Sequence, residues 1–417
     1  MTVVVAHPTG SPWVRSDIAA LDRAGRLTAF YTTIAVPPGV AQSGALPASF
    51  RRELARRTFG ELPQCNIVTS PSRELLRLAA RAAGLSWLTR HEVGWASWDA
   101  VYRALDRRLS RDLEVGKVEA STVLAYEDAA LESFRMARRL GLRSVYHLPI
   151  AYWRLLHQLL AEERDRRPEW AATMEGLADS PAKQQRKDLE LAQADCVVVA
   201  SSFTRQSLAY CPELPKRIEV APYGAPPVVA RERAPGDERG RPLRALFVGH
   251  LSQRKGVADL DEAMRRVRGL VTLTLVGPRT TEACAALDQA IQTHRWIPHV
   301  AHSRLLELMA AYDVLVFPSI VEGFGLVITE ALSRGLPVIT TPHTGGPDLM
   351  VDGREGFIVP IRDPDAIADR LTRLAEDRDL LAAMSQAALE TARRNSWQGY
   401  EERIVQIVAG ATGSGTA

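Results

Sequence analysis

Short apolar runs bounded by turn residues alternate with longer amphipathic stretches along the chain. Runs of this kind predict β-strands, and an apolar repeat every three to four residues predicts helices. Their alternation is typical of βαβ units wound around a parallel sheet. In the first half of the chain we expect strands at Val3 to Ala6, Leu27 to Thr33, Asn66 to Thr69, Thr122 to Ala125, Ser144 to His147 and Cys196 to Ala200.

A second series of strands begins after a polar stretch rich in proline and glycine, residues 226–242. Its run Val314 to Phe317 is wholly apolar, as a strand covered on both faces requires. We therefore predict two doubly wound α/β domains, at residues 1–225 and 243–395, joined by a linker at 226–242 and followed by a disordered tail at 414–417. The strands expected in the second domain are Leu243 to Val248, Val271 to Val276, Val314 to Phe317 and Pro337 to Thr340.

Residues 151–178 have a mostly helical pattern between these two series of strands. We expect a break at Pro168, because proline lacks the amide hydrogen that a helix interior uses. All residues from Glu162 to Arg167 are charged. The pattern places this charged patch on the solvent-exposed side of the helix.

Length and cysteine usage narrow the class of protein. The 417 residues exceed the size at which one hydrophobic core usually stops growing, which favours two domains. Cys65, Cys196, Cys211 and Cys284 are widely spaced and form no CxxC pair, so we expect neither a zinc site nor a disulfide framework. The apolar start of the chain is too short for a signal peptide, and no later run reaches about 18 apolar residues. A cytoplasmic protein is expected.

The net charge is only +3, but basic residues concentrate in the first half of the chain. Twelve arginines against six acids lie between Arg51 and Arg111, among them Arg52, Arg56 and Arg57. Such a surface could draw the protein to an anionic membrane, at the inner face of the cell membrane, or to an acidic acceptor. A solvated arginine-rich surface is the commoner alternative. We expect no nucleic-acid partner.

The expected strand Leu243 to Val248 leads into a loop bracketed by Gly249 and Gly256, after which a helical pattern starts. Such a loop lets backbone amides approach phosphate oxygens, and the following helix adds partial positive charge. Arg254 and Lys255 in this loop could hold a diphosphate and stabilise it as it leaves. An ordinary turn with two exposed basic residues remains the alternative.

The first strand leads into a weaker loop of the same kind, His7-Pro-Thr-Gly-Ser11, in which Gly10 is the single glycine. No strand is followed by the GxGxxG fingerprint of dinucleotide-binding proteins. The sequence therefore counts against NAD or FAD binding, and we expect neither a cofactor nor a metal ion.

Two glutamates bracket the start of a helix after the expected strand Val314 to Phe317. Glu330 lies a little over one turn into that helix, where its carboxylate could accept hydrogen bonds from the vicinal hydroxyls of a ribose. Glu322, in the preceding loop, could meet a hexose hydroxyl. The amides of residues 323–326 lie at the helix start, where N–H groups lack intrahelical partners. A surface helix residue and a loop charge are the alternative reading.

This segment resembles the glutamate-seven-glutamate motif of the retaining family-four glycosyltransferases, which have the GT-B fold. Glu322 and Glu330 have the spacing of that motif. The flanking segments also resemble the family pattern: Ala311 to Ser319, Gly335 to Thr340, Gly345-Gly-Pro-Asp348, Asp352 to Gly356 and, upstream, Arg254-Lys-Gly256.

The resemblance implies two Rossmann-like domains with parallel sheets facing a central cleft, an acceptor domain first and a donor domain second. It implies that the substrate is a nucleotide diphosphate sugar, a UDP- or GDP-hexose. It also implies that a final helix, residues 396–413, crosses back to the first domain. By resemblance, the donor would be held by Gly10, Gly249, Arg254, Lys255, Gly277, Pro278, Ile297, Glu322, Gly323, Phe324, Gly325, Leu326, Val327 and Glu330.

Family members place a histidine of the first domain near the donor sugar. His147, at the end of an expected strand, occupies a similar position and is our candidate for the catalytic histidine, together with Arg254, Lys255 and Glu322. A core or rim histidine is the alternative. We interpret Glu127 and Asp128, which follow another strand, as solvated loop charges. The remaining histidines considered, His7, His91, His299 and His302, are less well placed.

Three other functions stay open: a GT-B sugar-nucleotide epimerase, a phosphorylase, and a catalytically silent binding subunit. An epimerase needs carboxylates arranged for proton transfer, and a phosphorylase needs a pyridoxal-binding lysine. Neither arrangement is identifiable in the sequence. The presence of Arg254, Lys255, Glu322 and Glu330 argues against a silent subunit. The acceptor and the oligomeric state cannot be read from the sequence.

Overall fold

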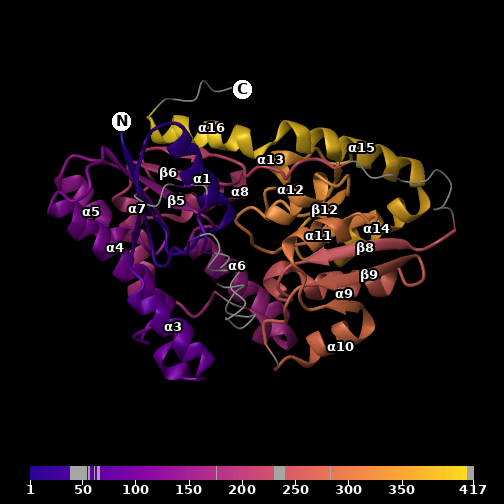
Figure 1. Cartoon of the computed structure of the whole chain (residues 1–417). Helices are drawn as coiled ribbons and strands as arrows, with labels where there is room; N and C mark the ends of the chain where they lie inside the picture. The colour runs from indigo at the N-terminus through magenta and orange to yellow at the C-terminus, as the bar shows by residue number, and fades with distance from the viewer. Residues whose placement is uncertain are drawn as a thin grey trace.

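The computed structural model contains two parallel β-sheets, one in each half of the chain (Figure 1). It describes residues 1–37, 54, 57–60, 62, 66–174, 176–229, 240–281 and 283–410. Several positions named above lie outside the described residues: Arg51, Arg52, Arg56, Cys65, most of the linker 226–242, the last residues of 396–413 and the tail 414–417.

The first sheet has seven parallel strands in the order β3-β2-β1-β4-β5-β6-β7. The order reverses between β1 and β4, and the carboxyl ends of strands at such a reversal are where α/β sheets generally bind ligands. The expected strands are confirmed, and the short edge strand β7 was missed. The bounds are β1 (Val3–Ala6), β2 (Leu27–Thr32), β3 (Ile67–Thr69), β4 (Thr122–Tyr126), β5 (Arg143–Leu148), β6 (Cys196–Val199) and β7 (Ile218–Val220).

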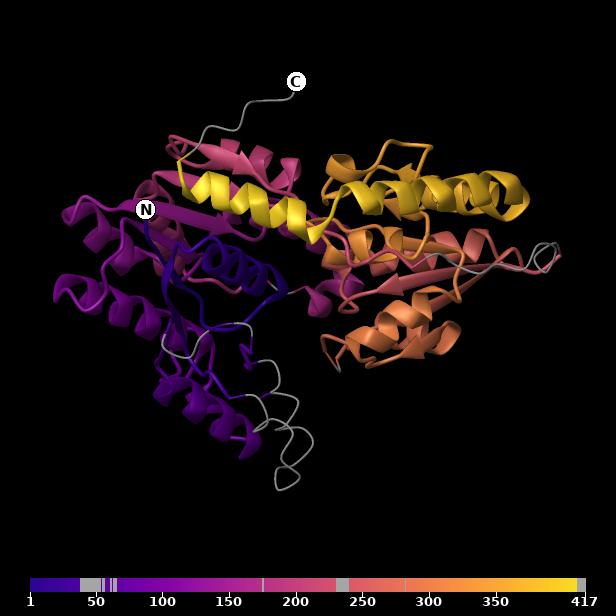
Figure 2. The same cartoon turned by 45° about the horizontal axis from the view of Figure 1, so that its top comes forward.

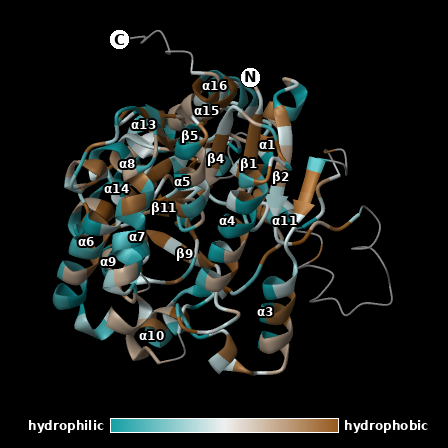
Figure 3. Ribbon diagram, turned by 90° about the vertical axis from the view of Figure 1, so that its left-hand side faces the viewer, coloured by the Kyte–Doolittle hydropathy of each residue, from teal (hydrophilic) through white to brown (hydrophobic). Residues whose placement is uncertain are grey.

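Helices cover both faces of this sheet, as a parallel sheet requires. Figure 3 shows brown, hydrophobic residues along strands such as β4, and teal, hydrophilic residues on outer helices such as α6 and α9. The helices of this half are α1 (Pro12–Arg23), α3 (Ser72–Ala82), η3 (Ser86–Leu88), α4 (Trp98–Glu114), α5 (Leu131–Arg139), α6 (Trp153–Arg166), η4 (Pro168–Thr173), α7 (Pro181–Ala192), α8 (Ser202–Ser207) and η5 (Leu208–Tyr210).

The second sheet has six parallel strands in the order β10-β9-β8-β11-β12-β13. Its expected strands are confirmed, and β10 and β13 were missed. The elements are β8 (Leu243–Val248), η6 (Gln253–Lys255), α9 (Val257–Arg266), β9 (Val271–Val276), α10 (Ala285–Thr293), β10 (Arg295–Ile297), α11 (His302–Met309), β11 (Val314–Phe317), α12 (Leu326–Leu332), β12 (Val338–Thr340), α13 (Gly346–Leu349), β13 (Gly356–Ile358), α14 (Pro364–Glu376) and α15 (Arg378–Arg394).

The last described helix, α16 (Trp397–Val408), leaves the second half of the chain and lies along α1 (Figure 2). Its apolar side joins the core on one face of the first sheet. Two hydrogen bonds fix it there: Tyr400 Oη donates to Asp17 Oδ1 over 2.7 Å, and Ser16 Oγ donates to Glu401 Oε1 over 2.7 Å. The chain therefore crosses between the two sheets a second time at Asn395 and Ser396.

The charged residues of α6 do not all face solvent, and that expectation was wrong for Glu163. The Glu163 side chain is 0% exposed, because the end of α6 packs against η6 and α9 of the second half. Its carboxylate accepts hydrogen bonds from Gln253 Nε2 and Arg362 Nε, over 2.7 and 2.8 Å. Arg166 bridges the same carboxylate to Asp259. The break expected at Pro168 is confirmed, since η4 starts there.

Candidate active site

The glycine-bracketed loop after β8 packs against the segment after β11. Gly256 has a φ of 73°, and a Cβ at this position would lie 2.1 Å from Pro318 O. Only glycine fits both requirements. The amide of Ile320 also donates to Arg254 O over 2.9 Å. These contacts join two loops that are separated by more than 60 residues in the sequence, and they fix the backbone of Arg254 beside the backbone that leads to Glu322.

Arg254, Lys255 and Glu322 converge where these two loops meet. Lys255 Nζ forms an ion pair with Glu322 Oε2, and Arg254 Nη1 lies 3.4 Å from the same oxygen. Arg254 Nη1 also donates to Val321 O over 3.1 Å. The Lys255 ammonium lies 4.8 Å from the centre of the Phe317 ring. Two cations and one carboxylate thus share one small, largely enclosed space.

The pKa of Lys255 lies well below its ordinary value, because the side chain is buried and the Arg254 guanidinium repels a second positive charge. An anion placed beside these two cations would lower the cost of keeping both charged. The pair is therefore electrostatically suited to a phosphate or diphosphate group.

The carboxyl ends of three neighbouring strands meet beside this loop. Gly277 N donates to Ile297 O over 2.9 Å, and Gly249 N donates to Val276 O over 2.9 Å. Gly277 has a φ of 140°, and a Cβ there would lie 2.0 Å from Gly249 O. Pro278 O accepts a hydrogen bond from Leu251 N over 3.0 Å. The structure thus brings Gly249, Gly277, Pro278 and Ile297 together at one edge of the second sheet.

Glu330 faces a separate space from Glu322. Its Oε1 lies 2.8 Å from His302 Nε2, and both residues line a cavity of about 370 Å³. The other wall of that cavity comes from α1 and α16, including Arg15, Ser16 and Trp397. The cavity therefore lies between the two halves of the chain, where α/β proteins generally bind ligands.

The loop that carries Glu322 also forms the seam with the first half of the chain. A Cβ at Gly323 would lie 1.9 Å from Pro149 O, in the segment after β5. Gly323 O accepts hydrogen bonds from Ser201 Oγ and Thr204 Oγ1, over 2.6 and 2.9 Å. Gly323 is thus required for close contact with protein backbone. Nearby, the Ser202 amide donates to the Asp348 carboxylate over 3.0 Å.

The following residues, Phe324 to Val327, turn the chain into α12. Phe324 is 2% exposed, and its ring packs edge-on against Tyr223, with ring centres 5.1 Å apart. Gly325 has a φ of 87° and approaches the Phe317 ring. Within the part of the chain that the structure describes, no protein acceptor takes the amide hydrogens of Phe324, Gly325 and Leu326. These amides can serve a ligand.

His147 lies in the core of the first half rather than beside Glu322. Its side chain is 1% exposed, its Nε2 lies 3.1 Å from Tyr223 Oη, and its ring stacks on Tyr126. His147 Nδ1 is buried without a hydrogen-bond partner and lies 3.5 Å from Asp17 Oδ2. The residues that touch Gly323 after β5 are Pro149 and Ile150. A catalytic role for His147 stays a prediction.

Gly10 follows β1 at the carboxyl edge of the first sheet. A Cβ at Gly10 would lie 2.7 Å from the Phe59 ring, and Gly10 O accepts a hydrogen bond from Arg15 Nε over 3.0 Å. The glycine is therefore needed for packing against Phe59. Donor contact through this loop stays a prediction.

The acids after β4 are not solvated loop charges, so that interpretation was wrong. The Glu127 side chain is 11% exposed and pairs with Lys187 over 3.4 Å. Burial raises the pKa of Glu127, and the Lys187 ammonium opposes this rise. The Asp128 carboxylate lies 3.6 Å from the ammonium of Lys183, which is on α7 like Lys187. Helix α7 thus neutralises both carboxylates at the carboxyl end of β4.

Two histidines near the second sheet were not recognised from the sequence. His302 was set aside although it contacts Glu330, and no sequence pattern links residues 28 positions apart. His343 lies in the loop after β12, where His343 O accepts from Glu322 N over 3.1 Å and the ring stacks on Phe203. The stacked ring and the Ser202–Asp348 contact both join this loop to α8.

Among the described residues, one group of side chains could supply three metal ligands: His91, Glu92 and Asp179. Asp179 already lies within 3.2 Å of the ammonium groups of Lys183 and Lys187, which would repel a cation. Glu92 accepts a hydrogen bond from Ser180 N over 2.7 Å. The group is therefore better described as an ion-pair cluster, and the absence of a metal from the reaction stays a prediction.

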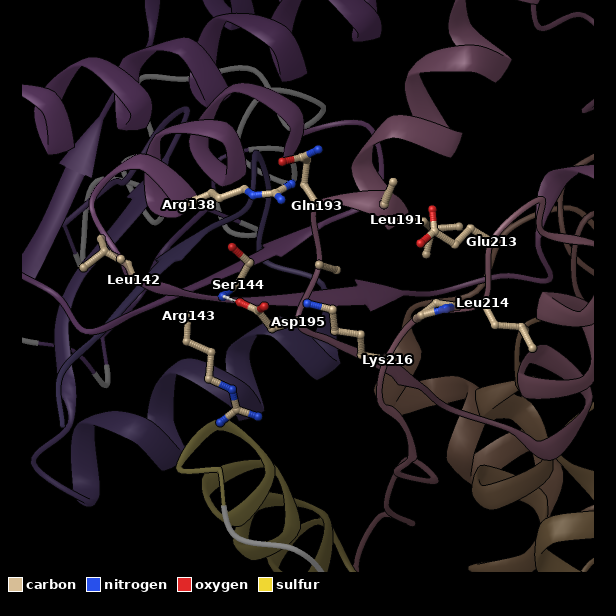
Figure 4. Close-up of a pocket in the computed structure, with 14 residues that line it drawn as sticks. Arg138, Leu142, Arg143, Ser144, Leu191, Gln193, Asp195, Glu213, Leu214 and Lys216 are labelled. Atoms are coloured by element: carbon tan, nitrogen blue, oxygen red, sulfur yellow. Dashed lines mark hydrogen bonds between the residues drawn. The ribbon is translucent and has the colours of Figure 1, made fainter.

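A wider cavity of about 700 Å³ lies elsewhere, at the amino-terminal ends of β5 and β6 (Figure 4). Arg138, Arg143 and Lys216 line it together with Glu213, and the Asp195 carboxylate accepts from Ser144 N over 2.9 Å. This edge of the sheet is opposite to the carboxyl edge that carries the predicted site. None of the residues that we predicted for donor binding lines this cavity.

The sequence of the second half matches a known family. Residues 229–391 match the family described as "Glycosyl transferases group 1". The D-inositol 3-phosphate glycosyltransferase of Corynebacterium efficiens is 29% identical over 300 residues, which cover 65% of this chain and 68% of that relative. The glycogen synthase of Mycobacterium tuberculosis H37Rv is 30% identical over 182 residues, 42% of this chain and 44% of that protein.

Solved structures resemble the whole described fold. Sucrose-phosphate synthase from Thermosynechococcus elongatus superposes with a TM-score of 0.64 at 17% identity, over 98% of both chains. The Anabaena protein HepE, solved in complex with UDP-glucose, superposes with a TM-score of 0.63 at 17% identity, over 98% of this chain and 100% of that one. The likeness confirms the expected fold class, two parallel-sheet α/β domains arranged as in GT-B enzymes.

Proposed function

We propose that this chain is a group 1 glycosyltransferase. It transfers a hexose from a UDP- or GDP-sugar to an acceptor hydroxyl with retention of configuration. One observation carries the proposal. Arg254, Lys255 and Glu322 converge at the carboxyl edge of the second sheet. They supply in one place two cations for a diphosphate and a carboxylate that can accept hydrogen bonds from sugar hydroxyls. A glycan, a glycolipid or a small metabolite would provide the acceptor hydroxyl.

In this proposal Arg254 and Lys255 hold the diphosphate and stabilise the negative charge that develops on it as the glycosidic bond breaks. The amides of Phe324, Gly325 and Leu326 assist at the β-phosphate, because helix starts favour anions. The donor displaces Glu322 from the two cations, which frees its carboxylate to accept hydrogen bonds from hexose hydroxyls. No metal ion is required, since protein cations neutralise the diphosphate.

Glu330 holds the ribose in the same proposal. Its cavity lies between the two halves of the chain, and vicinal hydroxyls can donate to both carboxylate oxygens. The nucleobase lies at the strand ends formed by Gly277, Pro278 and Ile297. His147 acts near the donor sugar only if its ring becomes exposed, because the ring is buried against Tyr126 and Tyr223.

A donor screen tests the function directly. UDP-, GDP- and ADP-hexoses are added to the protein and its thermal unfolding is followed. A ligand at about 100 times its dissociation constant stabilises the fold by about 2.7 kcal/mol. Release of free nucleotide in the presence of pooled acceptors then reports turnover. Binding of a nucleotide sugar without turnover of any donor would favour the silent binding subunit, and interconversion of the free sugar nucleotide would favour an epimerase.

His302 is expected to make nucleotide binding depend on pH. Its hydrogen bond to Glu330 raises the pKa of His302 above the ordinary 6.5, and the Arg334 guanidinium opposes this rise. The protonated ring therefore holds Glu330 at low pH, and the ion pair weakens as pH rises through the raised pKa. Because a ribose must replace His302 at Glu330, nucleotide affinity should increase as pH rises through this range.

Calorimetric titration of the nucleotide across this pH range measures the effect. His302→Ala should bind more tightly than the wild type at low pH and lose this part of the pH dependence. His91→Ala, which changes an exposed histidine of the first half, should keep the wild-type profile. An identical profile in His302→Ala and the wild type would place the ribose away from Glu330.

A further inference from the structure

Exposed hydrophobic side chains gather on one short stretch of the first half of the chain. Of the fourteen large hydrophobic residues that are exposed among the described residues, six lie between positions 75 and 98. Three of these six are tryptophans. The six side chains are Leu75, Leu85, Trp87, Val93, Trp95 and Trp98, with exposed fractions of 47, 42, 68, 74, 60 and 44%.

The backbone between α3 and α4 is folded back on itself and holds these side chains in a compact tip, residues 73–98. Ala96 N donates to Leu88 O over 2.9 Å, which brings the segment that carries Trp95 beside the short helix η3, which carries Trp87. A Cβ at Gly94 would lie 2.4 Å from Leu88 O, which shows how tightly the loop closes. The tryptophans are therefore fixed outward by the fold.

Two arginines of α3 contact the faces of tryptophan rings in the tip. The Arg73 guanidinium lies 4.7 Å from the centre of the Trp95 ring, and that of Arg77 lies 3.8 Å from the Trp98 ring. Arg77 is itself buried, and it pairs with Glu74 over 2.7 Å. Arg57 pairs with the same carboxylate. Two arginines of the basic segment are thus structural and do not belong to a solvated surface.

The charges of this region divide between the interior and the surface. Three of the acids between positions 72 and 111 are buried: Glu74 and Asp106 are 0% exposed and Asp99 is 8% exposed. The fourth, Glu92, is bound to Ser180. By contrast, Arg81, Arg90 and Arg107 are exposed and form no ion pair with any described residue.

The positive charges act on one another. Burial lowers the pKa of Arg73, and repulsion from Arg107 and Arg103 lowers it further. The outer surface of the tip therefore combines aromatic side chains with arginines that no described acid neutralises. This combination is uncommon on a free surface, because exposed tryptophans gain nothing from contact with water.

The segment that carries the tip begins at the carboxyl edge of the first sheet. β3 ends at Thr69 and α3 begins at Ser72, so α3 starts at the carboxyl edge, where the loops after β1, β4 and β5 also lie. Figure 1 shows α3 extending away from the body of the first half. The tip is thus connected to the sheet at its carboxyl edge, the edge where α/β sheets generally bind ligands.

We propose that residues 73–98 dock the protein on the surface of an anionic phospholipid bilayer. Tryptophan prefers the interface between headgroups and acyl chains, and arginine binds the phosphate groups at that depth. Protein interfaces are also enriched in tryptophan and arginine, so a protein partner is the alternative that the experiment below tests. In this geometry Trp87, Val93 and Trp95 enter the interface, while Arg81 and Arg90 contact lipid phosphates. Among the described residues, no helix is long and apolar enough to cross a membrane.

Co-sedimentation with vesicles tests this docking without any donor or acceptor. The full chain should sediment with vesicles that contain phosphatidylglycerol in phosphatidylcholine, should bind phosphatidylcholine vesicles far more weakly, and should lose binding as salt is raised. The variants Trp87→Ser/Trp95→Ser and Arg81→Glu/Arg90→Glu should each reduce binding to the anionic vesicles by about tenfold or more.

Matched controls change equally exposed residues elsewhere. Leu214→Ser/Val351→Ser and Arg139→Glu/Arg393→Glu should bind anionic vesicles like the wild type, and circular dichroism should show all variants folded. The proposal is overturned if the wild type does not sediment with anionic vesicles, or if the tip variants sediment like the controls. It is also overturned if the tip tryptophans are needed only for self-association, as analytical ultracentrifugation would show.

Discussion

Lys255→Ala is expected to lower kcat/KM by about 10²- to 10³-fold, the usual effect of removing one preorganised group that stabilises developing charge. The Lys255 side chain is 12% exposed and its ammonium contacts Glu322. The second cation, Arg254, lies 3.4 Å from the Glu322 carboxylate. We expect that Arg254 alone does not compensate for the loss of the Lys255 ammonium. The loss should appear mainly in kcat, because the diphosphate gains negative charge between the bound donor and the transition state.

Steady-state kinetics with the donor found by thermal screening measure this effect. The control is Lys216→Ala, which removes an exposed lysine at the opposite edge of the first sheet and should leave kcat/KM unchanged. Denaturant unfolding should show that both variants remain folded. Wild-type kcat/KM in Lys255→Ala would show that the loop after β8 does not hold the leaving group.

The strands of both sheets were predictable where both faces are covered. The run Val314–Phe317 is wholly buried, so its apolar pattern is unbroken and its prediction is confirmed. The strands that were missed are three residues long and lie at or near sheet edges, where polar residues are tolerated. β7 contains Glu219 and β10 begins with Arg295. A short run with an exposed polar residue carries no signal that separates it from a loop.

The convergence of the basic pair with Glu322 follows from topology. β8 and β11 are adjacent parallel strands, so the loops at their carboxyl ends meet whatever their separation in sequence. The partner of Glu330 was not predictable, because His302 comes from α11 and reaches Glu330 only through the packing of α11 on α12. The spacing of motif residues identifies loops, whereas contacts between helices depend on the finished fold.

The charged residues of α6 show the same limit more strongly. An isolated amphipathic helix places its charges in water, and the sequence gives no sign that a second domain will cover them. In the structure Gln253, beside Arg254, donates to Glu163, and Arg362 reaches it from after β13. The network thus connects the first half of the chain to the loop after β8.

Glu163→Ala is expected to destabilise the protein by about 3–5 kcal/mol, the usual cost of removing one partner from a buried ion pair. The Glu163 carboxylate is 0% exposed and accepts hydrogen bonds from Arg166, Gln253 and Arg362. Its removal leaves buried donors unsatisfied and leaves positive charge uncompensated. Urea unfolding at neutral pH, followed by circular dichroism, measures the change in the free energy of unfolding.

Glu162→Ala provides a control at the adjacent position. Glu162 is 45% exposed, and Arg362 is the one described cation that it contacts, over 3.0 Å. Its loss should therefore lower the free energy of unfolding by about 0–1 kcal/mol, as for a surface ion pair. If the buried carboxylate also fixes Gln253 beside the basic loop, Glu163→Ala will weaken nucleotide binding and Glu162→Ala will not. Equal stability of the two variants would mean that the Glu163 network contributes little to the stability of the fold, and equal nucleotide binding would mean that the orientation of the basic loop does not depend on α6.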